Sequence, residues 1–123
     1  MRIYFVSPNP IWGGAATANM AIASMLAADH TVFYNDEYNK VSNENVLYDS
    51  FPVHKSKYSE ALYNHIVENK VDWVIWGIAM NLPYYKPLTR KLNEANIRQC
   101  VLFHSLSISR NIIGRLMECL ISR

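Results

Sequence analysis

The segment that joins the first apolar run to the first helical stretch carries the residues best suited to hold a ligand. It reads Ser7-Pro8-Asn9-Pro10-Ile11-Trp12-Gly13-Gly14-Ala15-Ala16 and leads directly into an alanine-rich stretch. Gly13 and Gly14 have no Cβ, so the backbone N–H groups at the helix start can approach an anion closely. The helix adds about half a positive charge at that point. The pattern predicts contact with a phosphate or diphosphate, although two glycines also suit a simple tight turn.

Other site residues are suggested by their type and position. Trp12 lies in the glycine loop, where it can stack on a sugar ring or hold the loop against the body of the protein. His104 follows the last apolar run, and a histidine at the carboxyl end of a strand can hydrogen-bond a sugar hydroxyl or carry a proton. The alternative for His104 is a hydrogen-bonded wall residue. His65 falls on an apolar helical stripe and is expected to be a satisfied core residue.

Several common nucleotide and metal motifs are absent. The sequence contains no G-x-G-x-x-G, no Gly-Lys-Ser/Thr and no H-E-x-x-H. Asp36 lies 22 residues after Gly14, where a ribose-binding acid would stand, but a solvated turn residue is the simpler interpretation. Cys100 and Cys119 form no C-x-x-C pair, which argues against a zinc cage or a disulfide framework. We therefore expect no metal and no cofactor.

The composition is that of an ordinary globular domain. The chain has 123 residues, of which 50% are hydrophobic and 18% charged, enough for one domain with its own core. Twelve basic and ten acidic residues leave a net charge of +2, which does not call for a nucleic-acid partner. No run approaches the roughly 20 apolar residues of a membrane span, and the first apolar run is too short for a secretory signal. The expected location is the cytoplasm.

Short apolar runs alternate with helical stretches along the whole chain. The runs at residues 3–6, 31–34, 73–76 and 100–103 are nearly continuous, which is typical of strands buried on both faces. A fifth run at 51–54 contains Pro52 and would have to lie at a sheet edge. Residues 35–50 fit neither periodicity and are expected to form a surface loop.

Helical spacing accounts for the segments between the runs. Three apolar stripes predict buried helix faces: Ala18, Ala21, Ile22, Met25 and Leu26; Tyr58, Ala61, Leu62, His65 and Ile66; Tyr85, Leu88, Leu92 and Ala95. Ser56 is a candidate N-cap, and Pro87 is tolerable only in a first turn. A fourth helix is expected over 109–121. Strand–helix alternation predicts a single α/β domain: a Rossmann-like, doubly wound parallel sheet flanked by helices.

With these elements in place, the chain resembles the N-terminal domain of GT-B-fold glycosyltransferases, in particular the retaining family that includes glycogen and sucrose synthases. The residues that carry the resemblance are Ile3-Tyr4-Phe5-Val6-Ser7-Pro8, Gly13-Gly14-Ala15, Asn19, Ala21, Leu26-Ala27 and His30-Thr31-Val32. Residues 70–75 and 97–105, the latter ending in Phe103-His104-Ser105, are similar to later strands of that domain. The opening motif is moderately specific, and the others are short.

The resemblance implies the acceptor-side half of a hexosyltransferase. Gly13 and Gly14, with Trp12 and Ala15, would line the cleft near the donor diphosphate, and His104 would act near the transferred sugar as the catalytic residue. Many relatives carry an acidic residue where this chain has Ala16, which leaves the held acceptor hydroxyls open. The implied partners are a nucleotide-sugar donor and a sugar or lipid-linked acceptor.

The family also implies a second domain that binds most of the nucleotide-sugar, and its paired-glutamate motif is absent from residues 1–123. We therefore expect this domain to belong to a longer protein and to be inactive alone. The stretch from Arg110 to Arg123 is basic and amphipathic, a pattern that can bind an anionic membrane surface but more often packs on a core. Two alternatives stay open: a non-catalytic phosphate- or nucleotide-binding module, and a flavodoxin-like or dehydrogenase fragment.

Overall fold

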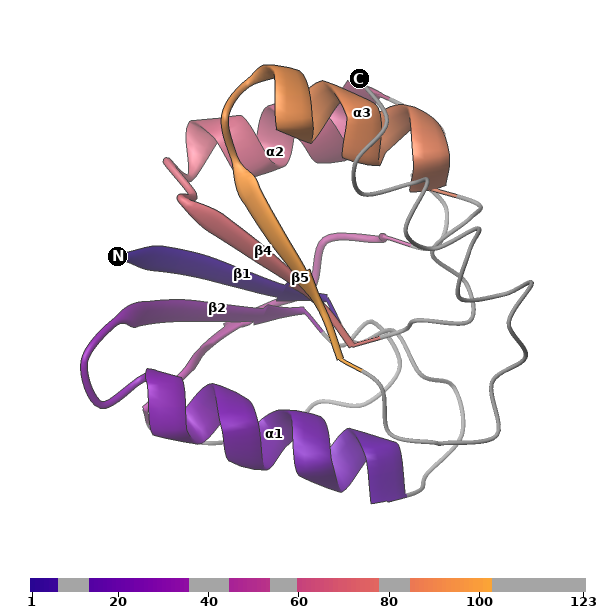
Figure 1. Cartoon of the computed structure of the whole chain (residues 1–123). Helices are drawn as coiled ribbons and strands as arrows, with labels where there is room; N and C mark the ends of the chain where they lie inside the picture. The colour runs from indigo at the N-terminus through magenta and orange to yellow at the C-terminus, as the bar shows by residue number, and fades with distance from the viewer. Residues whose placement is uncertain (7–13, 36–44, 54–59, 78–84, 103–123) are drawn as a thin grey trace.

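The computed structural model describes residues 1–6, 14–35, 45–53, 60–77 and 85–102. Within these ranges, five parallel strands form one sheet, in the order β3-β2-β1-β4-β5 (Figure 1). The strands are β1 (Arg2–Val6), β2 (Thr31–Asn35), β3 (Leu47–Asp49), β4 (Trp73–Trp76) and β5 (Arg98–Val101). This all-parallel arrangement confirms the predicted α/β fold class.

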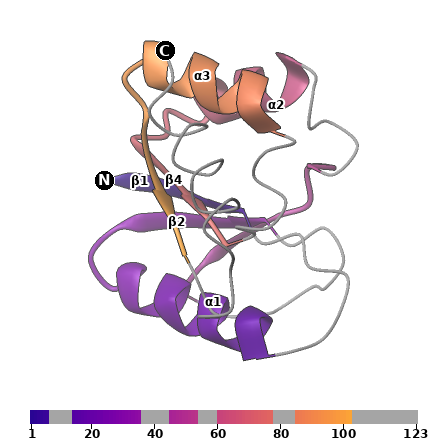
Figure 2. The same cartoon turned by 45° about the vertical axis from the view of Figure 1, so that its right-hand side comes forward.

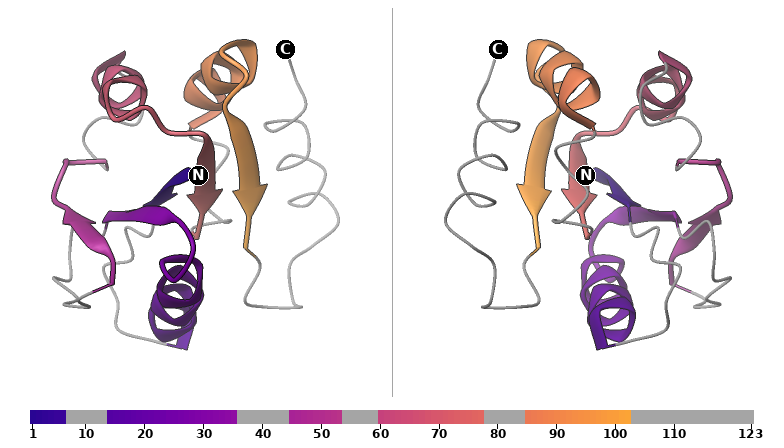
Figure 3. Two further views of the ribbon diagram at one scale, coloured as in Figure 1. Left: turned by 90° about the vertical axis from the view of Figure 1, so that its left-hand side faces the viewer. Right: turned by 90° about the vertical axis from the view of Figure 1, so that its right-hand side faces the viewer.

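Helices cover both faces of the sheet. Helix α1 (Gly14–Leu26) lies on one face, and α2 (Glu60–Glu68) and α3 (Lys86–Glu94) lie on the other (Figures 1 and 2). Of the described helices, α1 lies on one side of the sheet and α2 and α3 on the other, as Figure 3 also shows from two further directions. The fold is therefore Rossmann-like and doubly wound, as the alternation of strands and helices predicts.

Alternate side chains of β1 enter two separate cores. Tyr4 and Val6 pack in the cluster beneath α2 and α3, whereas Ile3 and Phe5 pack in the cluster beneath α1. All four side chains are nearly or fully buried. A central parallel strand with helices on both faces has no polar side, which explains why residues 3–6 form a continuous apolar run.

The edge of the sheet differs from the sequence prediction. Strand β3 lies at Leu47–Asp49, inside the segment expected to be a surface loop, and it pairs with residues 33–35 of β2. The predicted edge strand at 51–54 is wrong: Phe51 and Pro52 belong to no strand, Val53 lies in a turn, and His54 is outside the described residues. Pro52 has no N–H to donate to a ladder, so pairing stops before it.

The buried face of α1 also differs from the predicted stripe. Asn19 and Ala23 are fully buried, whereas Ala21 is exposed and Met25 is 76% exposed. Most residues of α1 are small and apolar, so its sequence does not define a single apolar stripe that must face the sheet.

The predictions for the other two described helices are confirmed in most positions. Leu62 and Ile66 of α2 are buried, although Ala61 is exposed. In α3, Pro87 lies in the first turn, and Leu88 and Leu92 are buried. Tyr85 is buried against Trp76, with ring centroids 5.2 Å apart, whereas Ala95 is exposed. Ser56, Tyr58 and the predicted helix over 109–121 lie outside the described residues.

The last described strand begins two residues earlier than the predicted run at 100–103. It spans Arg98–Val101, and Phe103 lies outside the described residues. None of the helices in the described ranges combines the length and apolar character needed to cross a bilayer.

Candidate functional site

The strand order reverses between β1 and β4, and this is where an open parallel sheet binds its ligands. β1 ends at Val6, and β4 ends at Trp76, directly before Gly77. The N–H of Gly77 donates to the carbonyl oxygen of Val6 over 2.8 Å, so the two strand exits stay together. Helix α1 runs antiparallel to the strands, which brings its first residue, Gly14, to the same end of the sheet (Figure 1). We call this place the carboxyl-end crevice, a name for its position in an open parallel sheet.

One buried side chain joins α1 to the exit of β4. Asn19 of α1 is fully buried, and its Nδ2 donates to the carbonyl oxygen of Gly77 over 3.3 Å. A Cβ on Gly77 would lie 2.9 Å from Cγ of Asn19 and closer still to Nδ2. An alanine at position 77 would therefore require the Asn19 side chain to shift. Asn19 was not among the predicted site residues, although the resemblance included it.

Two of the residues predicted to contact a diphosphate lie in the described part of the chain. Gly14 and Ala15 begin α1 at the carboxyl-end crevice, the position expected for them from the sequence. Trp12, Gly13 and His104 lie outside the described residues. Within the described part of the chain, no group of three or more histidine, cysteine, aspartate or glutamate side chains is arranged to hold a metal ion.

A second polar group, the Asp49 cluster, lies between β3, β1 and α2. It consists of Asp49, Tyr4, Asn35, His65 and Phe51. Tyr4 Oη donates to Asp49 Oδ2, and His65 Nε2 lies 2.7 Å from the same oxygen. Asn35 Nδ2 donates to Tyr4 Oη over 2.9 Å and to the Phe51 carbonyl over 2.8 Å. The Phe51 ring stacks on the His65 ring at 4.3 Å.

The Asp49 cluster holds the edge of the sheet in place. Asp49 Oδ1 also accepts the N–H of Phe51 over 3.2 Å, so both carboxylate oxygens are used. The expected hydrogen bonding of His65 is confirmed, but its side chain is 25% exposed and lies at the margin of the core, not inside it. Asn35 Oδ1 is buried without a hydrogen-bond partner in the described part of the chain. Because the hydrogen bonds described above join the members of the cluster to one another, we infer that its role is to stabilise the fold.

Tyr4 should make the free energy of unfolding decrease as the pH rises in the alkaline range. Burial, and then the hydrogen bond to Asp49, raise the pKa of the Tyr4 hydroxyl far above its ordinary value of about 10. The folded protein therefore keeps Tyr4 protonated at a pH at which the unfolded chain releases that proton. The contribution of Tyr4 is fully present below about pH 10 and falls by about 1.4 kcal/mol per pH unit above it.

The measurement is urea unfolding between pH 7 and pH 11.5 for the wild type and Tyr4→Phe. The variant should be less stable at pH 7. Above pH 10 the slope of its unfolding free energy against pH should be smaller than that of the wild type, by the amount that one proton contributes. Equal slopes for the two proteins would contradict the assignment.

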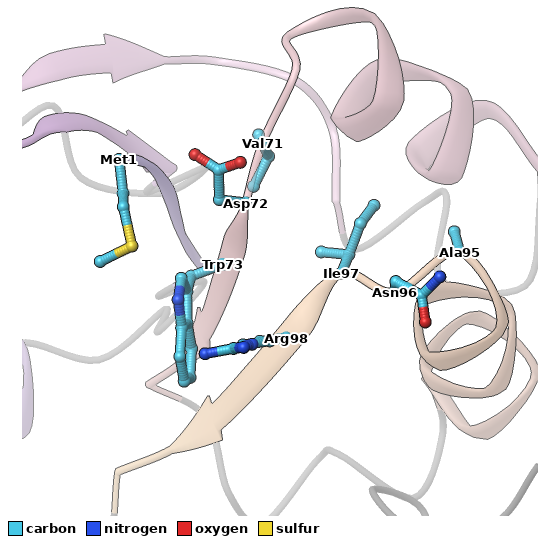
Figure 4. Close-up of a pocket in the computed structure, with 8 residues that line it drawn as sticks. All are labelled: Met1, Val71, Asp72, Trp73, Ala95, Asn96, Ile97 and Arg98. Atoms are coloured by element: carbon cyan, nitrogen blue, oxygen red, sulfur yellow. The ribbon is translucent and has the colours of Figure 1, made fainter.

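A hollow of about 480 Å³ lies at the opposite, amino end of β4 and β5 (Figure 4). Two of its polar side chains, Asp72 and Arg98, contact neighbours within the protein. Asp72 Oδ2 accepts the N–H of Arg2 over 2.8 Å, and the Arg98 guanidinium lies 5.6 Å from the centre of the Trp73 ring. Since opposite charges line this hollow and contact their own neighbours, we place the candidate site at the carboxyl-end crevice instead.

Comparison of the chain with protein-family models, with curated proteins and with solved structures finds no match. The fold and the geometry of the carboxyl-end crevice therefore carry the functional argument, together with the resemblance in the opening motif. That crevice joins the exits of β1 and β4 to the first turn of α1, with Asn19 and Gly77 in direct contact between them.

Proposed function

We propose that this chain is the acceptor-side domain of a GT-B-fold glycosyltransferase that transfers a hexosyl group from a nucleotide-sugar. The observation that supports this most is the position of Gly14: α1 begins at the point where the strand order reverses. Backbone N–H groups there can stabilise the charge that develops on a departing diphosphate without a metal ion.

The roles of the remaining residues follow from the resemblance and stay part of the proposal. Trp12 and Gly13 would complete the diphosphate and sugar contacts around Gly14 and Ala15. His104, after the last strand, would hydrogen-bond the transferred sugar or carry a proton. The acceptor would be a sugar or a lipid-linked sugar, and the protein would act in the cytoplasm. The basic, amphipathic stretch at 110–123 would make a peripheral membrane contact.

The second candidate is a non-catalytic module that binds a phosphate or nucleotide. The five-stranded sheet has its core on both faces, and the carboxyl-end crevice is built within this one domain. Anion binding at Gly14 therefore needs no second domain, whereas catalysis does. This candidate predicts binding without sugar transfer.

Sugar transfer by the native gene product separates the two candidates. We expect that product to move labelled hexose from a nucleotide-sugar to an acceptor, and His104→Ala to lower kcat about 100-fold, the usual scale for loss of general acid–base help. His30→Ala, a histidine at the amino end of the sheet, is the matched control and should keep the wild-type rate.

Binding of sodium pyrophosphate without any transfer would favour the module. Neither transfer nor binding would refute both candidates. Full activity of His104→Ala would refute the catalytic role of His104 alone.

A further inference from the structure

We propose that Asn19 is the positioning residue of the carboxyl-end crevice: its side chain sets the distance between the start of α1 and the exit of β4, and so the shape of the anion site. The structural part of this inference rests on the contact between Asn19 and Gly77. The ligand part rests on the function proposed above.

An asparagine at this position is unfavourable for the helix itself. Asn19 is fully buried in a helix whose other residues are mostly small and apolar, and asparagine is a weaker helix former than alanine. Burying a polar amide also destabilises the fold unless the amide is hydrogen-bonded. Alanine would suit the helix better, so the hydrogen bonding of Asn19, which includes the bond to Gly77, explains this residue.

Three elements meet at Gly77. Its N–H donates to Val6 at the end of β1, and its carbonyl oxygen accepts the amide of Asn19 from α1. Asn19 stands five residues after Gly14, which is about 7.5 Å along a helix at 1.5 Å per residue. The side chain therefore ties the second turn of α1 to the exit of β4, close to the first backbone N–H groups of the helix.

The contact is also a steric interlock. Gly77 has no room for a Cβ because the Asn19 amide fills that space. If Asn19 is shortened, an alanine at position 77 should fit. If Asn19 is kept, the same alanine should push α1 away from β4. A rigid crevice binds an anion more tightly because less ordering remains to be done on binding.

The experiment titrates the protein with sodium pyrophosphate and follows the backbone amides of Gly14, Ala15 and Gly77 by NMR. We expect Asn19→Ala to raise the Kd for pyrophosphate about tenfold, which is the scale of effect expected when one ordinary hydrogen bond is lost. Asn19→Leu keeps the branched shape but cannot donate, so it should show the same loss even if the alanine variant folds poorly. Asn64→Ala, an exposed asparagine of α2, is the matched control and should bind like the wild type.

Thermal unfolding tests the interlock separately from the ligand. Gly77→Ala should lower Tm by about 8 °C in the wild type and by only about 2 °C in Asn19→Ala. Equal decreases in the two backgrounds would overturn the inference. So would wild-type affinity in both Asn19 variants, which would leave the proposed function standing. If the wild type does not bind pyrophosphate, the proposed anion site and the role of Asn19 fail together.

Discussion

Replacing Trp76 with alanine should lower the free energy of unfolding by about 4 kcal/mol. Trp76 is the largest fully buried side chain of the described core, and it packs against Tyr85 beneath α3. Its Nε1 donates to Gln99 Oε1 over 2.8 Å, and Gln99 in turn donates to the Thr89 carbonyl of α3 over 3.0 Å. The substitution would leave a cavity and would also leave the partly buried Gln99 amide oxygen without its donor.

Urea unfolding at neutral pH measures the effect of this substitution. Trp76→Phe keeps most of the volume and should cost less, with the lost hydrogen bond to Gln99 as its main defect. Trp73→Ala is the matched control on the same strand, because Trp73 is only half-buried and its ring contacts Arg98 near the surface. If both alanine variants destabilise the protein equally, the central position of Trp76 in the core is refuted.

Replacing Asp49 with alanine should lower the free energy of unfolding by about 3 kcal/mol. Asp49 accepts hydrogen bonds from Tyr4, His65 and the backbone of Phe51. Its loss would leave the buried Tyr4 hydroxyl without an acceptor and release the edge strand β3 from β1 and α2. Amide hydrogen exchange at residues 47–49 should accelerate more than exchange at β1.

A double-mutant cycle with Tyr4→Phe isolates the buried hydrogen bond. In the Tyr4→Phe background, Asp49→Ala should cost about 1–2 kcal/mol less, because no buried hydroxyl is left unpaired. Asp72→Ala is the matched control: its carboxylate is exposed and accepts the N–H of Arg2, so its removal should cost less than about 1 kcal/mol. Additive effects of Tyr4→Phe and Asp49→Ala would contradict the described cluster.

From the sequence, the proposed anion site can be predicted only to the level of one loop. Two adjacent glycines between an apolar run and an alanine-rich stretch predict an anion-binding turn, and the structure brings Gly14 to the end of the sheet where such turns act. The assignment to glycosyl transfer, including His104, remains a prediction. Asn19 could not be selected from the sequence, because its partner, Gly77, is 58 residues away.

The strands with no exposed face can be predicted from the sequence alone. Residues 3–6 form most of β1 and residues 73–76 form β4 because the side chains there must be apolar, a pattern visible without knowledge of the neighbours. The edge strand β3 and the buried face of α1, by contrast, become evident only in the tertiary structure. Leu47, Tyr48 and Asp49 have little strand preference as a group, and their pairing with β2 and the bond from Asp49 to Tyr4, 45 residues away, make them a strand. Contacts between distant residues depend on how the elements come together, and local residue patterns do not encode that.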